Sequence, residues 1–201
     1  MMLDKKINNY LEKYLIYIAT ILYKYNCSAN FITLIGAVAG FFCFFCIVES
    51  EFFLAFLFLL LNRFFDGIDG TLARIDGASD LGAFYDIISD FVFYSLFPMG
   101  FVFNNIENAF SICFLLLSFV STQSTFLASA WIIEKNKILV KKNEKSFFYI
   151  GGITEGFETI IFFTLMLIFN DFVYLISYIF GLLCWITCVF RIYYIRKILL
   201  S

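Results

Sequence analysis

Long apolar segments, interrupted by short polar patches, restrict the fold of this chain more than any other feature. Each has about the length that an α-helix needs to cross a bilayer, roughly 20 residues. Because backbone polar groups inside lipid must pair within the chain, we expect these segments to be helices. They cover residues 31–48, 52–74, 81–103, 110–133, 150–169 and 172–190.

Composition agrees with a membrane protein. Hydrophobic residues make up 62% of the chain and the mean hydropathy is +0.90, both far above the range of soluble domains. A length of 201 residues allows about six spans with short connections and no sizeable soluble domain. We therefore predict an all-α polytopic membrane protein, with residues 1–201 forming a single domain.

The first thirty residues are not expected to be a secretory signal, because their apolar stretch "YLIYIATILY" is short, flanked by lysines and followed by no small-residue cleavage site. Apolar side chains recur within residues 1–27 at helical spacing, opposite two lysines, which indicates an amphipathic helix in the membrane interface. An ordinary packing helix explains the pattern equally well. The apolar positions are Leu3, Ile7, Leu11, Tyr14 and Ile18, and the lysines are Lys6 and Lys13.

Basic residues predict the orientation, because cytoplasmic loops are enriched in Lys and Arg. In the predicted topology all fourteen fall on one side, and the opposite loops carry only acids: Glu49, Glu51, Glu107 and Asp171. We therefore place both termini and the hairpin of residues 66–90 on the cytoplasmic side of the cell inner membrane.

Six cysteines raise the question of a metal site. Cys43 and Cys46 have C-x-x-C spacing, but they lie within an apolar span, and the chain contains no histidine. Zinc sites use Cys and His ligands, commonly presented from loops, so we interpret the cysteines as small packing residues.

Four aspartates stand beside or inside apolar segments. Asp66 and Asp69 are three residues apart and Asp86 and Asp90 are four apart, so each pair occupies one face of its helix. Between the pairs, Asp76 and Gly77 predict a tight bend, followed by Ser79 as a helix N-cap. A rise of about 1.5 Å per residue places the two pairs at similar depth across the hairpin.

Carboxylates at such close quarters repel one another unless a cation neutralises their charge. Oxygen ligands alone favour Mg²⁺, with Mn²⁺ as an alternative, and four acids suffice for two ions. Because Mg²⁺ keeps positions open for phosphate oxygens, we interpret the hairpin as a site where a diphosphate is bound and broken.

Glycines within the same stretch support this interpretation. Gly67, Gly70 and Gly82 each weaken a helix by about 1 kcal/mol relative to Ala, a cost that calls for a compensating role. The missing side chains let a nucleotide approach the backbone, and Ala73 adds a further small residue to this surface. The guanidinium of Arg74 can donate two hydrogen bonds to a phosphate. Close packing of helices through small residues is the alternative.

These residues resemble the signature of the CDP-alcohol phosphatidyltransferase family, D-x2-D-G-x2-A-R-x8-G-x3-D-x3-D. All eight fixed positions match: Asp66, Asp69, Gly70, Ala73, Arg74, Gly82, Asp86 and Asp90. One departure is that seven residues separate Arg74 from Gly82 where eight are usual, which shortens the turn and leaves the helical register intact.

The resemblance covers the whole chain. "SANFIT" at residues 28–33 is similar to the family's Pro-Asn-x-x-Thr entry to the first span, with Ala29 in place of proline. "KSFFYIGGITEGFETI" at residues 145–160 resembles an uncharacterised branch of small bacterial inner-membrane members.

The resemblance implies a role for each matching residue. Asp66, Asp69 and Asp86 would hold two Mg²⁺ ions, and Asp90 would complete the site as the general base. The CDP pocket would be lined by Gly70, Ala73, Arg74 and Gly82, with Asn30 and Thr33 also touching the nucleotide. It further implies a homodimer and, as substrate, CDP-diacylglycerol, whose phosphatidyl group passes to a small polar alcohol with release of CMP in phospholipid biosynthesis. No nucleic acid partner is expected.

The alcohol acceptor stays open at this point. Glu155 and Glu158 are intramembrane acids three residues apart, suited to an acceptor's hydroxyl or ammonium groups, and equally suited to a structural bridge with Lys145 or Arg191. Polar residues at Gln123, Ser124 and Thr125 are further candidates, although polar contacts between helices also explain them. A phosphorylated acceptor would need basic residues near the site, and those available are Arg63, Arg74, Lys145 and Arg191, so a phosphorylated and a neutral acceptor both stay open.

Other functions fit part of the pattern. One is a phosphotransferase that moves an amino-alcohol phosphate from its CDP derivative to diacylglycerol. An ion transporter would also place acids inside helices, but along a pathway and in broken helices rather than in one hairpin. A non-catalytic scaffold would need no acid cluster.

Overall fold

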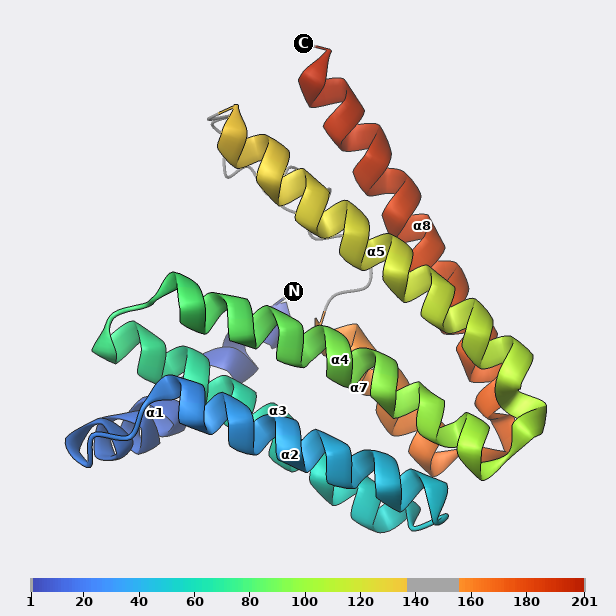
Figure 1. Cartoon of the computed structure of the whole chain (residues 1–201), viewed down its shortest axis with the longest axis horizontal. Helices are drawn as coiled ribbons and strands as arrows, with labels where there is room; N and C mark the ends of the chain where they lie inside the picture. The colour runs from blue at the N-terminus through green and yellow to red at the C-terminus, as the bar shows by residue number, and fades with distance from the viewer. Residues whose placement is uncertain (1, 137–155, 201) are drawn as a thin grey trace. The chain divides into compact units, whose positions relative to one another are not determined.

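The computed structural model describes residues 2–136 and 156–200. This part of the chain consists of helices joined by short turns, and it contains no β-strand, as predicted. The chain divides into two compact units, Met1–Phe97 and Pro98–Ser201. The α-helices (Figure 1) are α1 Met2–Lys24, α2 Ala29–Val48, α3 Phe52–Asp76, α4 Asp80–Asn104, α5 Ala109–Lys135, α7 Gly156–Ile168 and α8 Val173–Leu199. Two single 3₁₀ turns, η1 Ile106–Asn108 and η2 Asn170–Phe172, precede α5 and α8.

In the first unit, α2 and α3 form a closely packed hairpin. Gly36 of α2 permits the approach, because a Cβ there would lie 3.3 Å from Cβ of Phe65. Asn62 of α3, only 2% exposed, donates its amide to the carbonyl oxygen of Gly36 at 2.8 Å. Such contacts through small residues and amides are typical of helix pairs in membranes. Farther along α2, a Cβ at Gly40 would clash with the ring of Phe93, which brings α4 close to α2 at this point.

Helix α1 packs on α3 through a small apolar core. Ala19 of α1 lies buried with Ile32, Ile68 and Leu72, and Leu15, Ile18 and Leu22 pack against this group. Ile18 therefore lies on the buried face as its spacing predicted, whereas Tyr14 is 59% exposed. The side chains of Leu3, Lys6, Ile7 and Leu11 lie outside those described. The apolar face of α1 therefore packs against a helix, and a location of α1 in the membrane interface stays a prediction.

Local sequence explains where these helices begin and end. Ser28 caps α2, accepting a hydrogen bond from the backbone N–H of Phe31, so Ala29 stands at the first helical position. Proline is tolerated there because that N–H has no partner within the helix, and its replacement by alanine keeps the helix start. Gly77 ends α3 with φ of 104°, a conformation that other residues rarely adopt. Ser79 accepts a hydrogen bond from the N–H of Gly82, which confirms the predicted cap of α4.

The second unit pairs α5 with α8, and α7 also contacts α8. Phe180 lies at its centre, fully buried, with its ring stacked on Phe162 at 4.4 Å and edge-on to Phe119 at 5.3 Å between centroids. Arg191 of α8 is only 4% exposed and donates to the carbonyl oxygen of Thr122 of α5 at 2.7 Å. This buried arginine therefore joins helices, and it is not a loop charge of the kind that sets membrane orientation.

Four helical segments of the described chain are long and apolar enough to cross a membrane. They are Ala29–Val48, Asp80–Asn104, Ile106–Lys135 and Asn170–Leu199. Helix α3 carries Arg63, Asp66 and Asp69 within its length, and α7 is a shorter apolar helix. Residues 150–155 of the predicted fifth span lie outside the described residues. The chain is an all-helical membrane protein, and a count of six spans stays a prediction.

The cysteines differ in burial: Cys113 is exposed, and Cys27 and Cys46 are partly exposed. Cys43, Cys184 and Cys188 are buried, and all six are free thiols. In the part of the chain that the structure describes, no cysteine belongs to a cluster with metal-binding geometry.

Gly181 provides a test of the second unit. A Cβ there would lie 2.7 Å from the ring of Phe114 and 3.5 Å from Cα of Leu115. We expect Gly181→Val to lower the Tm in detergent by roughly 3–10 °C, because α5 and α8 must separate. The matched control is Leu182→Val at the neighbouring position, which is 56% exposed. An unchanged Tm for Gly181→Val would contradict the packing of these helices.

Candidate functional site

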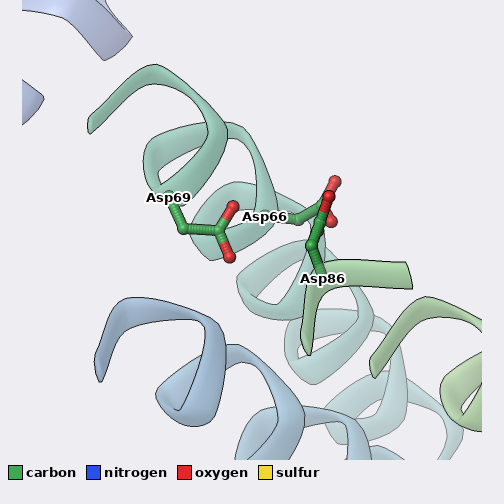
Figure 2. A group of neighbouring side chains, drawn as sticks. All are labelled: Asp66, Asp69 and Asp86. Carbon is green, nitrogen blue, oxygen red and sulfur yellow. The ribbon is translucent and has the colours of Figure 1, made fainter. Parts of the chain in front are cut away.

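Three of the four aspartates converge on one point. Asp66 and Asp69 of α3 and Asp86 of α4 each offer a carboxylate oxygen, and these three oxygens lie within 4.8 Å of one another. Figure 2 shows the three side chains directed toward a common space between the two helices. The predicted meeting of the two aspartate pairs across the hairpin is therefore confirmed for these three residues.

Asp69 is held at one oxygen and open at the other. Thr33 of α2 donates its hydroxyl to Oδ2 of Asp69 at 2.6 Å. Among the described residues nothing hydrogen-bonds to Oδ1, although Asp69 is only 4% exposed. A buried carboxylate oxygen without a partner is costly, and a cation among the three carboxylates would compensate it. The oxygen-only ligand set suits a hard divalent ion such as Mg²⁺ or Mn²⁺.

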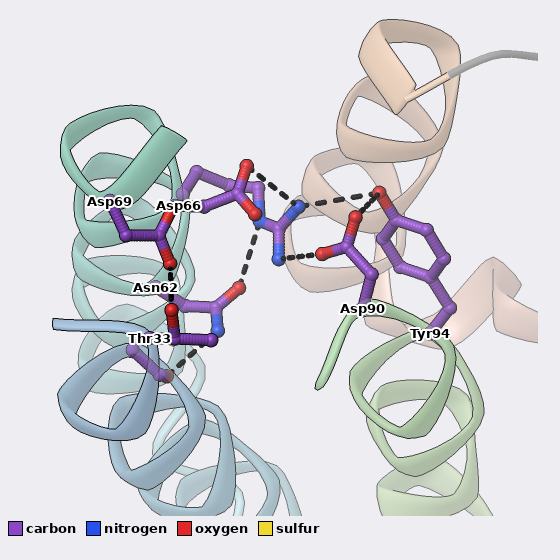
Figure 3. Close-up of polar contacts among 8 residues, drawn as sticks. Thr33, Asn62, Asp66, Asp69, Asp90 and Tyr94 are labelled. Atoms are coloured by element: carbon purple, nitrogen blue, oxygen red, sulfur yellow. Dashed lines mark hydrogen bonds and ion pairs between the residues drawn. The ribbon is translucent and has the colours of Figure 1, made fainter. Parts of the chain in front are cut away.

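Asp90 lies one turn farther along α4 and has other partners. The guanidinium of Arg63 donates to Oδ1 of Asp90 at 2.9 Å, and its second terminal nitrogen lies 3.6 Å from Oδ2 of Asp66. The hydroxyl of Tyr94 makes a long hydrogen bond to Oδ2 of Asp90, 3.5 Å. Figure 3 shows these contacts, with Asp66 and Asp69 on one side and Asp90 and Tyr94 on the other. Arg63 thus links Asp90 to the three-carboxylate cluster.

A cavity of about 240 Å³ opens beside the cluster. Asp69 and Asp86 border it, together with the turn between α3 and α4 and the beginning of α2. Five of the residues predicted to bind a nucleotide line it: Asn30, Thr33, Gly70, Ala73 and Gly82. Sequence positions more than fifty residues apart therefore contribute to one small cavity.

Of the three glycines, Gly70 and Gly82 lie at the cavity and Gly67 lies at a contact between helices. A Cβ at Gly70 would meet only Nη1 of Arg74, at 3.8 Å, so this glycine leaves open space on the cavity wall. A Cβ at Gly82 would lie 3.2 Å from Oδ1 of Asn30, so the missing side chain lets this amide approach α4. Gly67 instead faces Leu15 of α1 at 3.2 Å, and for this glycine the helix-packing alternative is the correct one.

Arg74 lies near the cavity without lining it. Its guanidinium donates to the hydroxyl of Thr71 at 2.8 Å, one turn back on α3, and its side chain is exposed. The hydroxyl of Thr71 in turn donates to the carbonyl oxygen of Gly67. In this arrangement the remaining guanidinium nitrogens are available to an anion.

The acceptor candidates belong to the other unit. Gln123 lies on α5, Glu158 on α7 and Arg191 on α8, where Arg191 contacts Thr122 and Thr125. Lys145 and Glu155 lie outside the described residues. These assignments stay predictions.

Sequence reasoning missed Asn62 and Tyr94, and it used Arg63 to predict orientation and as a basic residue available to a phosphorylated acceptor. All three contribute to the polar network around Asp90. A signal was present: Asn62 and Arg63 interrupt an otherwise apolar run, and Tyr94 follows Asp90 by four residues. Polar residues within a membrane helix are functional candidates by default.

Comparison with known proteins shows the family of this chain. The model of the CDP-alcohol phosphatidyltransferase family matches residues 26–193. The inner membrane protein YnjF of Escherichia coli is 37% identical over 194 residues, covering 96% of this chain and 94% of its own. An uncharacterised protein of Aquifex aeolicus is 40% identical over 91 residues, 44% of this chain and 46% of its own.

A solved structure has the same fold. Phosphatidylinositol phosphate synthase of Mycobacterium tuberculosis, crystallised with CDP-DAG bound, matches with a TM-score of 0.72 at 16% identity, over 90% of this chain and 92% of its own. The aspartate hairpin, the cavity beside it and these matches lead to one conclusion. The chain belongs to the CDP-alcohol phosphatidyltransferase family.

Proposed function

We propose that the protein transfers the phosphatidyl group of CDP-diacylglycerol to a hydroxyl of a small polar alcohol and releases CMP. The observation that carries this proposal is the joining of a three-carboxylate cluster to a cavity walled by Gly70, Ala73 and Gly82. A nucleoside diphosphate ester needs both parts: a cation site that binds its phosphates, and a cavity wall of small side chains that leaves room for its nucleoside. The CDP-DAG bound to the mycobacterial enzyme of the same fold supports the choice of donor.

An apolar groove supports a lipid donor. Its volume is about 440 Å³, and it runs between α2 and α4 along Leu34, Ala37, Phe41 and Val92. Asn30 and Thr33 border both this groove and the cavity beside the carboxylate cluster. A substrate with a polar head and hydrocarbon tails fits two adjoining spaces of this kind.

The proposed reaction assigns a role to each acid. Asp90 takes the proton of the acceptor hydroxyl as general base. The hydroxyl oxygen then forms a bond to the phosphorus next to the lipid glycerol, and the bond from that phosphorus to the bridging oxygen breaks. CMP leaves with the electron pair. Asp66, Asp69 and Asp86 would hold the divalent ions, which supply positive charge against the diphosphate oxygens.

The location proposed is the inner membrane, with the site facing the cytoplasm. Within the first unit, the cavity lies at the end that carries Lys24 and Arg74, whereas the turn at the opposite end carries Glu49 and Glu51. Basic residues favour the cytoplasmic side. The relative YnjF is an inner membrane protein, which supports the same location.

CMP release is the direct test. Purified protein with Mg²⁺ and CDP-diacylglycerol is tested against glycerol 3-phosphate, inositol, inositol phosphate and serine. We expect release with one acceptor, loss of release with EDTA, and a decrease of about 10²–10⁴-fold in Asp90→Asn, which lacks the base. Release by Asp90→Asn at the wild-type rate would contradict the assignment, and a protein that binds neither CDP nor a metal ion would refute the enzyme.

Gly70→Ala separates nucleotide binding from folding. The new methyl group meets no protein atom closer than 3.8 Å, and alanine favours the helix by about 1 kcal/mol. We therefore expect an unchanged or higher Tm together with a KM for CDP-diacylglycerol raised at least tenfold. The control is Ala55→Gly in α3, because Ala55 does not line the cavity. Ala78→Gly in the turn is unsuitable, because Ala78 does line the cavity. An unchanged KM in Gly70→Ala would place the nucleotide elsewhere.

Metal binding is measured without substrate. Because Oδ1 of Asp69 has no partner among the described residues, we expect Asp69→Asn to weaken Mn²⁺ binding on the order of 100-fold, as followed by electron paramagnetic resonance. Asp80→Asn, at the start of α4 and outside the cluster, should bind Mn²⁺ as the wild type does. The same titration gives the stoichiometry, for which the family resemblance predicts two ions. Equal affinity in both variants would exclude Asp69 as a ligand.

A further inference from the structure

Arg63 is a cation placed among acids in the interior of the first unit. Its side chain is 17% exposed, and it lies between Asp66 of its own helix and Asp90 of α4, as described above. Burying a cation is unfavourable unless its hydrogen-bonding groups find partners. Each nitrogen of this guanidinium has one: Nη2 contacts Asp90, Nη1 contacts Tyr94 and Asp66, and Nε donates to Asn62.

The orientation of the guanidinium is fixed from two sides. Asn62 accepts the Nε–H of Arg63 at 2.8 Å and is itself tied to the backbone of α2 at Gly36. On the other side the guanidinium lies against the rings of Phe93 and Tyr94, 5.1 and 5.4 Å from their centroids. A planar guanidinium held by hydrogen bonds and stacked on rings has little freedom left. Arg63 is therefore a rigid support and differs from a mobile surface cation.

Arg63 contacts Asp90, whereas Asp69 is held by a different residue. Arg63 and Tyr94 provide a donor to each carboxylate oxygen of Asp90, whereas Thr33 holds Asp69. A chain of contacts thus runs from the backbone of α2 through Asn62 and Arg63 to Asp90 on α4. Figure 3 shows Asn62 and Asp90 at opposite ends of it.

We infer that Arg63 is a positioning residue, which fixes the Asp90 carboxylate beside the three-carboxylate cluster in the orientation required to accept the proton of the acceptor hydroxyl. This inference rests on the proposed function. A base displaced by about 1 Å loses on the order of 100-fold in rate, so fixing its orientation has a large effect on turnover and a small one on donor binding. Arg63 itself forms no bond to the reacting atoms.

The kinetic test uses Arg63→Gln and Arg63→Lys with whichever acceptor of the panel supports release. We expect kcat to fall about 10–100-fold in Arg63→Gln. The KM for CDP-diacylglycerol and the affinity for Mn²⁺ should stay within threefold. Lysine keeps the positive charge but lacks the planar guanidinium with its several donors. Arg63→Lys should therefore have the Tm of the wild type, with a kcat between those of Arg63→Gln and the wild type. Arg196→Gln, an exposed arginine of the second unit, is the matched control and should keep the wild-type kcat.

Two results would overturn the inference. One is a wild-type kcat in Arg63→Gln. The other is a loss confined to Tm, donor KM or Mn²⁺ affinity, which would make Arg63 a structural or donor-binding residue.

A second measurement tests the pair independently of turnover. In metal-free protein, the Tm changes of Arg63→Gln and Asp90→Asn are compared with that of the double variant. Coupled residues give a double variant less destabilised than the sum of the two single changes, and additive changes would refute the contact. If the wild type releases no CMP with any acceptor of the panel, the proposed function fails, and the catalytic role of Arg63 fails with it. The comparison of single and double variants still decides whether Arg63 and Asp90 interact.

Discussion

Mutual repulsion of carboxylates inside an apolar helical hairpin is the constraint on which the rest of the first unit depends. Asp66, Asp69 and Asp86 place oxygens within 4.8 Å of one another, an arrangement that is unfavourable without positive charge nearby. Asp90 obtains such charge from within the chain, through Arg63. Arg63 also lies 3.6 Å from Asp66, and we propose that an ion supplies the remaining positive charge, beside the Asp69 oxygen that has no partner among the described residues.

Helix α2 supports the site without contributing an acid to it. Gly36 lets α3 approach closely and binds Asn62, Thr33 holds Asp69, and Asn30 borders the cavity opposite Gly82. The same helix forms one wall of the apolar groove. The acids of the hairpin are thus oriented in part by a neighbouring helix, as the hydrogen bond from Thr33 to Asp69 illustrates.

Similarity of fold and identity of substrate are separate matters in this family. The mycobacterial synthase shares the fold at 16% identity, and a fold alone does not select an acceptor. The donor half of the proposed reaction is supported by residues that lie together in the first unit. The acceptor candidates lie in the second unit or outside the described residues, and for that reason the alcohol is the part of the reaction that experiment must identify.

The sequence by itself determined the helical class, the turn at Gly77, the cap at Ser79 and the aspartates that meet across the hairpin, because these follow from hydropathy and from spacing along a helix. Resemblance to the family also marked five cavity residues, three of them through the signature and two, Asn30 and Thr33, through the entry to the first span. Only the tertiary structure decided that Gly67 packs against Leu15 while Gly70 stays open, since both glycines look alike in sequence and differ in the helix face they occupy. Likewise, only the structure joined Asn62, Arg63 and Tyr94 to Asp90, because contacts across three helices depend on packing distances that no local pattern records.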